Sequence, residues 1–171
     1  MAYRNDKDLE FLGSMSDSDL NDLVAAVTKD KDGKTWVSEE LTGKEIYKKN
    51  HPRHSMYWKE IAAEIQCFGA NSLATVLRRG EGVLYREVLQ DVCDKCKVTV
   101  NKNDAVQSVE EQLLIKLFGN AANKMSIEDR EKFAKMAGFS AAASLTPEAM
   151  LAAAQAAFLA GGVQSYRLTF M

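Results

Sequence analysis

The sequence predicts an all-α protein, an irregular multi-helix bundle with an alanine-rich C-terminal helix. Several segments place apolar residues at helical spacing behind a residue suited to cap a helix. The 171 residues include only two prolines, and long β-branched runs are few. Residues 97 to 101 alternate in a strand-like way, but a single strand without a partner cannot build a sheet.

The N-terminal half is expected to hold a series of short helices. In residues 14 to 30, Ser16 is the expected N-cap, with Asp19 three positions later. The apolar face of this helix comprises Leu20, Leu23, Val24 and Val27. Further helices are expected in four segments punctuated by Pro52 and by glycines, namely residues 42–50, 55–69, 71–80 and 83–98.

The C-terminal half begins with the longest expected helix, in residues 104 to 124. Its predicted buried residues are Val106, Val109, Leu113, Leu117, Phe118 and Ala121. Residues 124 to 138 repeat the earlier start signal, with Ser126 as the N-cap and Gly138 as the stop. On this helix, Phe133 and Met136 are expected to face the core.

The composition changes after residue 138, which suggests a helical domain at 1-138 and an alanine/glycine-rich C-terminal helix and tail at 139-171. Thr146 is the expected cap, and Pro147 takes the first helical position. The apolar stretch that follows rises only about 22 Å, which is too short to cross a hydrocarbon core of about 30 Å. Small residues recur every four positions at Ala153, Ala157 and Gly161. The helix therefore either covers the core or offers a close-approach surface to another helix or to lipid.

A C-x-x-C and an H-x-x-H motif raise the question of a zinc or redox site. Cys93 and Cys96 continue an apolar stripe at helical spacing, whereas zinc sites usually hold this motif on a tight turn. His51 lies in a loop before Pro52, and His54 opens a helix. No βαβ pattern surrounds the thiols, as a thioredoxin-like site requires. The prediction is therefore no metal and no cofactor.

Residues 28 to 39 can be aligned with a calcium-binding loop. Asp30, Asp32, Gly33 and Glu39 then fall on its third, fifth, sixth and twelfth positions. Thr28 stands at the first position, where a carboxylate is expected. The favoured interpretation is a turn closed by Asp-Gly, with Gly33 at positive φ.

Residues 65 to 89 carry the most unusual local chemistry. Asn71 and Ser72 can cap a helix that Arg78 and Arg79 end, and the glycines that follow allow close backbone approach. The favoured interpretation is a tight corner between helices, with the arginines solvated or paired with nearby glutamates. The alternative is an anion site at the start of the next helix.

Composition and charge limit the classes of function that the protein can have. A formal net charge of −2 removes the broad basic surface of a general nucleic-acid binder. Three cysteines cannot all pair, and the first twenty residues carry too much charge for a secretory signal, so a cytoplasmic protein is expected. The sequence contains no nucleophile elbow and no H-E-x-x-H motif, so enzymatic activity has no support in it.

Five runs stand out between residues 3 and 138: YRNDKDLEFL at 3–12, DKDGK at 30–34, EELTGKEIYK at 39–48, YWKEIAAEIQCFGANS at 57–72 and RGEGVLYREVLQDVCDK at 79–95. Together they resemble the YaaW-like family of bacterial proteins. Sequence classifications group this family distantly with the ubiquinol-cytochrome c chaperone superfamily, so the resemblance implies a helical protein that binds other proteins. Cys96 departs from the family pattern, which has an apolar residue such as leucine there. Relatives also tend to continue into a longer apolar tail.

The predicted function is a non-enzymatic chaperone-like or scaffold protein that binds other proteins through a groove around residues 57-89. The expected partner-binding residues are Tyr57, Trp58, Asn71, Ser72, Arg78, Arg79 and Tyr85. The alternative is a membrane-associated effector, peripheral to the inner membrane, that inserts or oligomerises through its C-terminal helix. The expected partners are thus a protein and, in the alternative, a membrane surface or a second copy of the chain. Nucleic acid is not expected.

Overall fold

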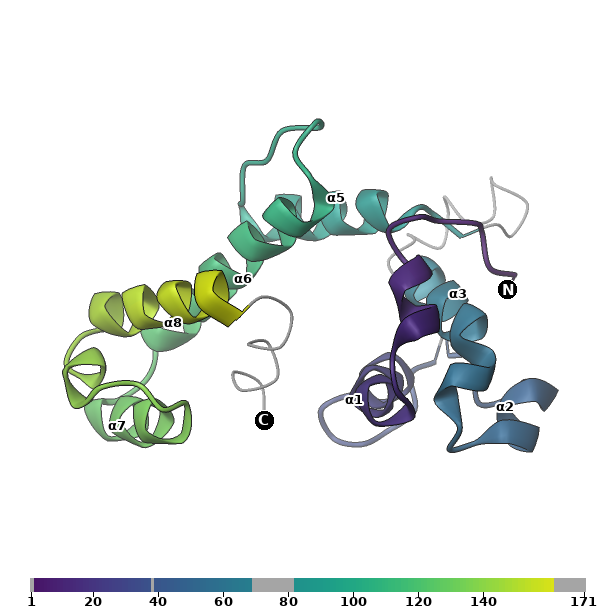
Figure 1. Cartoon of the computed structure of the whole chain (residues 1–171), viewed down its shortest axis with the longest axis horizontal. Coiled ribbons are helices and arrows are strands. Elements are labelled where there is room, and N and C mark those ends of the chain that lie inside the picture. The colour runs from purple at the N-terminus through teal and green to yellow at the C-terminus, as the bar shows by residue number, and fades with distance from the viewer. Residues whose placement is uncertain (1, 38, 69–81, 162–171) are drawn as a thin grey trace. The chain divides into compact units, whose positions relative to one another are not determined.

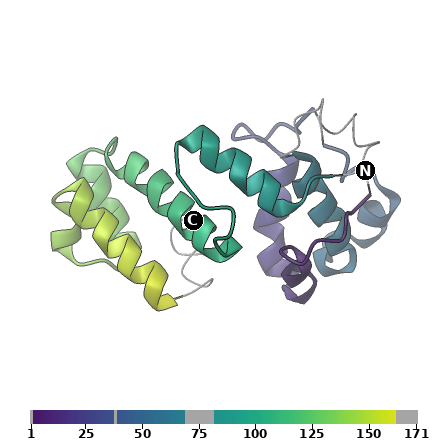
Figure 2. The same cartoon turned by 90° about the horizontal axis from the view of Figure 1, so that it is seen from above.

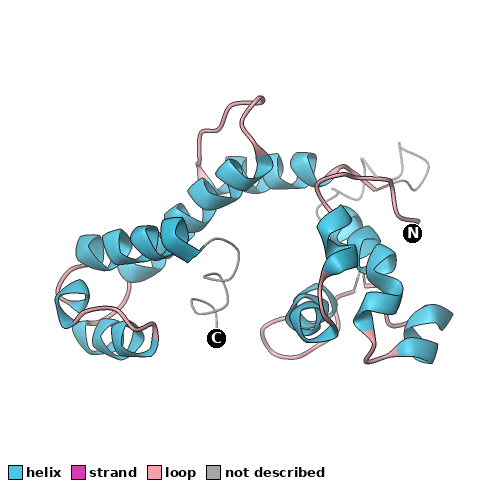
Figure 3. Ribbon diagram, viewed as in Figure 1, coloured by secondary structure: helices cyan, strands magenta, loops and turns pink. Residues whose placement is uncertain are grey.

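The computed structural model describes residues 2–37, 39–68 and 82–161, and helices joined by loops make up this part of the chain (Figures 1 and 3). The α-helices are α1 (Asp17–Thr28), α2 (Glu45–Asn50), α3 (Trp58–Phe68), α5 (Tyr85–Cys96), α6 (Val106–Ala122), α7 (Ile127–Met136) and α8 (Pro147–Gly161). Three 3-10 helices accompany them, η1 (Glu10–Ser14), η2 (His54–Tyr57) and η3 (Ala141–Ser144). No named strand occurs among the described residues, which confirms the predicted all-α class.

The chain forms two compact units, Met1–Val92 and Cys93–Met171. We call them the N-terminal unit and the C-terminal unit. The division at residue 138 that the composition suggests stays a prediction.

The core of the N-terminal unit gathers apolar side chains from η1, α1 and α3. Its buried members are Leu9, Leu12, Leu20, Val24, Val27, Leu41, Tyr57, Ile61 and Ala62. The predicted start of α1 is confirmed, because the Ser16 hydroxyl accepts a hydrogen bond from the Asp19 N–H at 3.2 Å. The predicted face of α1 is also confirmed, with Leu23 half-buried beside its three buried neighbours.

The N-terminal segment before η1 is tied to α3 and α5 by buried polar groups. The Gln66 side chain accepts from the Arg4 N–H at 3.0 Å and donates to the Arg4 carbonyl at 2.9 Å. The buried Asp6 carboxylate accepts from the Tyr85 N–H, at the start of α5, at 2.6 Å. Asp6 therefore satisfies one of the free amides at the beginning of a helix 79 residues away.

Gly82 leads into α5 beside Gln66. A Cβ atom added at Gly82 would lie 2.7 Å from the Gln66 Cβ, closer than real side chains pack. The predicted close backbone approach at Gly82 is thereby confirmed.

The C-terminal unit is built on α6, α7 and α8, and Figure 2 shows α6 and α8 side by side. Its core consists of Phe118, Ala122, Ala134, Met150 and Ala154. The Ser126 cap of α7 is confirmed by a 3.1 Å hydrogen bond from the Asp129 N–H, and the Gly138 stop by a φ of 72°. The predicted start of α8 is confirmed by a 3.1 Å hydrogen bond from the Ala149 N–H to the Thr146 hydroxyl.

Three predicted core residues of the C-terminal unit are wrong. Leu117 is 41% exposed, Met136 is 75% exposed, and Ala121 is exposed. The core side of α6 runs through Phe118 and Ala122, which α7 and α8 cover, and each preceding residue is turned away by about 100°. On α7 the packed residues are Phe133 and Ala134, so Met136 points to solvent.

The strand-like stretch at 97–101 forms the loop between α5 and α6. Lys97 follows α5 with a φ of 57°, and the Val98 N–H donates to the Cys93 carbonyl at 2.9 Å. This is the left-handed closure with which many helices end. The alternation of apolar residues here reflects a loop that folds back after a helix.

Candidate functional site

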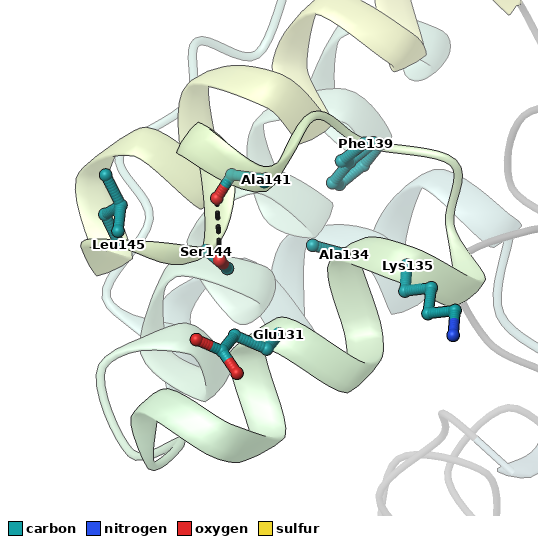
Figure 4. Close-up of a pocket in the computed structure, with 7 residues that line it drawn as sticks. All are labelled: Glu131, Ala134, Lys135, Phe139, Ala141, Ser144 and Leu145. Atoms are coloured by element: carbon teal, nitrogen blue, oxygen red, sulfur yellow. Dashed lines mark hydrogen bonds between the residues drawn. The ribbon is translucent and has the colours of Figure 1, made fainter.

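A pocket of about 400 Å³ opens in the C-terminal unit between α7 and η3 (Figure 4). We call it the α7–η3 pocket. Its lining residues come from α7 and from the turn that leads into α8, namely Glu131, Ala134, Lys135, Phe139, Ala141, Ser144 and Leu145. Figure 4 shows the Ser144 hydroxyl donating to the Ala141 carbonyl, at 2.7 Å, which closes the turn on one side of the pocket.

The buried Arg130 holds two lining residues of the α7–η3 pocket, Ser144 and Leu145, through their backbone carbonyls. This arginine is 7% exposed. Its guanidinium donates to the carbonyls of Ser144 at 3.0 Å, Met125 at 2.8 Å and Leu145 at 3.4 Å. Because one planar side chain holds carbonyls on both sides of α7, the pocket walls are joined by a rigid fork.

The opening of the pocket is apolar with a charged edge. Leu145 is 66% exposed and lines the pocket. Glu131 and Lys135 lie one turn apart on α7 and carry opposite charges. The pocket can therefore take an apolar side chain while its edge contacts polar groups on either side of that chain.

Tyr57 and Trp58 lie at the junction of η2 and α3. Tyr57 is 1% exposed, and its hydroxyl lies 2.6 Å from Nδ1 of His54, so it faces the core rather than solvent. Burial raises the pKa of Tyr57 to about 12. Trp58 is half-buried and packs edge-on against Tyr3, with the ring centroids 5.6 Å apart.

Of the other predicted partner-binding residues, the structure describes only Tyr85. Tyr85 is half-buried and packs against the N-terminal core. Asn71, Ser72, Arg78 and Arg79 lie outside the described residues. The alternative prediction is an anion site at the start of α5. There the Asp6 carboxylate of the chain itself accepts from the Tyr85 N–H, in the place where an external anion would bind.

The two cysteines of the C-x-x-C motif lie on α5, as predicted. Cys93 is buried, Cys96 is half-buried, and burial raises the pKa of the Cys93 thiol. Cys93 is therefore placed as a buried helix residue of low reactivity. Within the described ranges, no three side chains of histidine, cysteine, aspartate or glutamate gather as metal ligands.

The histidines form part of an aromatic cluster in the N-terminal unit. His54 is 1% exposed, and its Nε2 is buried without a hydrogen-bond partner. The ring of His51 stacks on Tyr47 and meets the His54 ring edge-on at a centroid distance of 5.4 Å. Burial first, and the neighbouring His51 second, lower the pKa of His54.

The predicted turn lies within the described residues 28 to 37. Oδ1 of Asp30 accepts from the N–H groups of Asp32 and Lys34, both at 2.9 Å. Gly33 has a φ of 76°, and the Trp36 N–H donates to the Thr28 carbonyl at 3.1 Å. The Asp30 carboxylate thus closes the turn together with backbone hydrogen bonds between Asp30 and both Gly33 and Lys34, and the predicted turn with Gly33 at positive φ is confirmed.

The sequence analysis missed the buried polar residues Asp6, Gln66 and Arg130. A signal exists only for Arg130, which precedes Phe133 and Ala134 by one helical turn and so shares their buried face. Nothing near Asp6 in the sequence points to α5. Both of its long-range partners depend on the tertiary fold.

Helix α8 packs one face on α6 and turns the other outward. Met150 and Ala154 are buried, whereas Ala153 and Ala157 are half-buried and Ala156 is exposed. No helix within the described ranges combines the length and the apolar character needed to cross a bilayer.

Comparisons with known proteins place the chain among bacterial relatives. Residues 3–37 match the family model described as a domain of unknown function, DUF3944. The chain is 38% identical to a UPF0174 protein of Helicobacter pylori, over 98% of the chain and 66% of that relative. It is 37% identical to the UPF0174 protein YaaW of Escherichia coli, over 77% of the chain and 56% of that relative. The chain thus matches about two thirds or less of the length of these curated relatives. No solved structure matches it.

Proposed function

The chain belongs to the YaaW-like family of UPF0174 proteins, and from this premise we propose that it is a non-enzymatic, chaperone-like protein that binds apolar segments of other proteins. The observation that carries the proposal is the α7–η3 pocket with the exposed Leu145 at its opening. A preformed apolar pocket that accepts one anchoring side chain is the usual centre of a protein interface.

The hydrogen bonds of Arg130 support this function, because a loop that must become ordered on binding lowers the affinity. Arg130 already fixes the carbonyls of Ser144 and Leu145, so little order remains to be gained when a segment binds. The opposite charges of Glu131 and Lys135 suit an amphipathic segment without strong net charge. We therefore place the main docking surface in the C-terminal unit, with Trp58 as a candidate second contact in the N-terminal unit.

The test measures whether the purified protein suppresses the aggregation of thermally unfolding citrate synthase, followed by light scattering. The Leu145→Lys variant removes the apolar edge, and Ala141→Trp fills the opening from an exposed position. Both variants should lose most of the suppression, while circular dichroism remains that of the parent. Ile127→Lys is the matched control, since Ile127 is equally apolar, 61% exposed and outside the pocket.

Two results would contradict the proposal. One is a parent protein that fails to suppress aggregation. The other is suppression that survives in Leu145→Lys and Ala141→Trp to the level of Ile127→Lys. A loss in all three variants would mean that exposed apolar surface acts without any pocket, which also removes the proposed site.

A second candidate function is peripheral membrane association through α8. The outward side of this helix carries Ala153, Ala156 and Ala157, and its one charged residue, Glu148, is exposed in the first turn. The alanine surface beyond that turn favours contact with another apolar surface. Flotation with vesicles of Escherichia coli polar lipids tests it. Replacing Ala153 and Ala157 by glutamate should abolish flotation of a protein that binds in this way, and a parent that stays unbound excludes the function.

A further inference from the structure

A second cavity of the C-terminal unit, of about 480 Å³, lies between the loop after α5, helix α6 and helix α8. We call it the α6–α8 cavity. It shares no lining residue with the α7–η3 pocket, and the proposed function does not use it. Its volume falls within the range of pockets that bind small molecules.

The lining of the α6–α8 cavity carries positive charge only. Lys97 and Lys116 both line it, and no carboxylate does. Both lysines are exposed, and neither is in an ion pair with any residue that the structure describes. Asp104, an acidic residue of the same loop, accepts instead from the Asn101 N–H at 3.0 Å. Two uncompensated ammonium groups beside a cavity attract an anion.

The cavity also has an apolar side and neutral hydrogen-bonding groups. Ile115 of α6 and Leu151 of α8 line it and pack at the edge of the C-terminal core. Thr99 and Gln112 add a hydroxyl and an amide to the lining. A simple inorganic anion would leave the apolar side uncovered, so the ligand needs an apolar portion as well as a negative charge.

Lys97 occupies a backbone position that lysine disfavours. Its φ of 57° makes it the one residue other than glycine with a positive φ among the described residues. Glycine or asparagine is the usual choice where a helix ends in this left-handed conformation. What lysine adds at this position is a long cationic side chain, and that side chain lines the cavity.

We propose that the α6–α8 cavity binds a single-chain anionic amphiphile, with its carboxylate or phosphate head between Lys97 and Lys116 and its apolar chain against Ile115 and Leu151. The charge selects the head group, and the apolar side selects the chain. Binding of either part alone is weak.

The first experiment is isothermal titration of the full chain with four probes below their micelle-forming concentrations. The probes are decanoate, decyl phosphate, inorganic phosphate and decyltrimethylammonium. We expect one-to-one binding of decanoate, decyl phosphate or both, and the tighter of the two identifies the head group. Equal binding of the cationic probe, phosphate binding as tight as that of decyl phosphate, or no binding of either anionic amphiphile would overturn the proposal.

The second experiment separates the charge of Lys97 from its backbone strain. Lys97→Gly should raise the melting temperature, because glycine accepts the positive φ. The same change should weaken binding of the amphiphile by about tenfold. Lys116→Gln should weaken binding of the amphiphile by a similar factor. Lys124 is an exposed lysine of the same unit that does not line the cavity, so Lys124→Gln should leave binding unchanged. Parent affinity in both Lys97→Gly and Lys116→Gln would refute the site, and the higher stability of Lys97→Gly excludes misfolding as the cause of a loss.

Amide chemical shifts locate the bound probe. The largest changes are expected at Val98, Thr99 and Gln112, around the α6–α8 cavity. Changes centred on Phe139 and Leu145 would instead place the probe in the α7–η3 pocket and overturn this inference without touching the proposed function.

Discussion

In the N-terminal unit, buried polar side chains join distant parts of the sequence, whereas the core of the C-terminal unit consists of apolar side chains on helices that follow one another in the sequence. Asp6 reaches Tyr85 across 79 residues, and Gln66 reaches Arg4 across 62. Among the described residues of the C-terminal unit, the one buried arginine, Arg130, reaches carbonyls only 5 to 15 residues away.

This difference sets how each unit should respond to substitution. A buried polar group that loses its partner costs more free energy than the hydrogen bond itself contributes, because the remaining group stays desolvated. The apolar core of the C-terminal unit, in which alanines pack beside Phe118 and Met150, has few such groups and depends on close helix packing instead. The N-terminal unit should therefore be the more sensitive of the two to changes that preserve shape but remove polar atoms.

The largest effect is expected for Asp6→Ala. This change removes the acceptor of the Tyr85 N–H and one of the two acceptors of the Gln66 amide, which also donates to the Arg4 carbonyl, and it should lower the free energy of unfolding by about 3 kcal/mol. Hydrogen–deuterium exchange should accelerate in α3 and not in α6. Asp22→Ala, an exposed aspartate of α1, serves as the control. Equal protection of α3 in the two variants would show that the polar network does not hold the N-terminal unit together.

A smaller effect is expected for Arg130→Met. Three carbonyls lose their donor, but methionine fills the volume and carbonyls tolerate weak solvation, so we expect a loss of about 2 kcal/mol. Exchange should accelerate in η3 and α8 while α3 stays protected. Lys132→Met, on the exposed side of α7, should leave both regions unchanged. Faster exchange throughout the chain would contradict the separation of the two units.

Acid should weaken the N-terminal unit through His54. Folding favours the neutral imidazole, because the buried ring has a lowered pKa while the unfolded chain retains a value near 6.5. Stability is therefore fully present above pH 6.5 and falls as the pH drops below it, by at most about 1.4 kcal/mol per pH unit for one proton. Asp17 opposes this shift, and His51 reinforces it.

Urea unfolding at pH 7.5 and pH 5.5, with exchange in α3 as the readout, checks the acid response. His54→Gln should flatten the dependence on pH, since the amide stays neutral. His51→Gln, at an exposed position, should flatten it less. If the parent and His54→Gln lose stability equally, other groups carry the response.

The smallest effects are expected for the helix caps, which are alike in the two units. Ser16→Ala and Ser126→Ala each remove a side-chain acceptor from a backbone N–H three residues on, and each should cost about 1 kcal/mol. Thermal unfolding measures both, with Ser16→Asp and Ser126→Asp as variants that retain an acceptor. A clear inequality between the two serines would mean that the units differ in local as well as in long-range interactions.

Features that depend on residues three or four apart were predictable from sequence. The caps at Ser16, Ser126 and Thr146 and the turn at Gly33 follow from local chemistry, and the structure has all of them. The inward face of α6 was only partly predictable. Both Leu117 and Phe118 are apolar, and the neighbouring helices decide which one is covered.

The candidate site depended on information that the sequence does not display. Two predicted contact residues, Tyr57 and Trp58, are aromatic and therefore suit an interface or a core equally well. Only the fold places Tyr57 inside, against His54. The α7–η3 pocket likewise requires Arg130 to meet three carbonyls on two segments, one before α7 and one after it, which no periodicity in the sequence indicates.

The contact between Gly82 and Gln66 has an evolutionary consequence. Any residue other than glycine at position 82 would collide with the Gln66 side chain, so the two positions cannot drift independently. A homologue that carries alanine at position 82 should carry glycine at position 66, because any other residue there keeps the Cβ atom that the alanine would meet, and it must then find another partner for the Arg4 backbone. Correlated substitutions at positions 4, 66 and 82 among homologues would show that the family preserves the contact between the N-terminal segment, α3 and the start of α5.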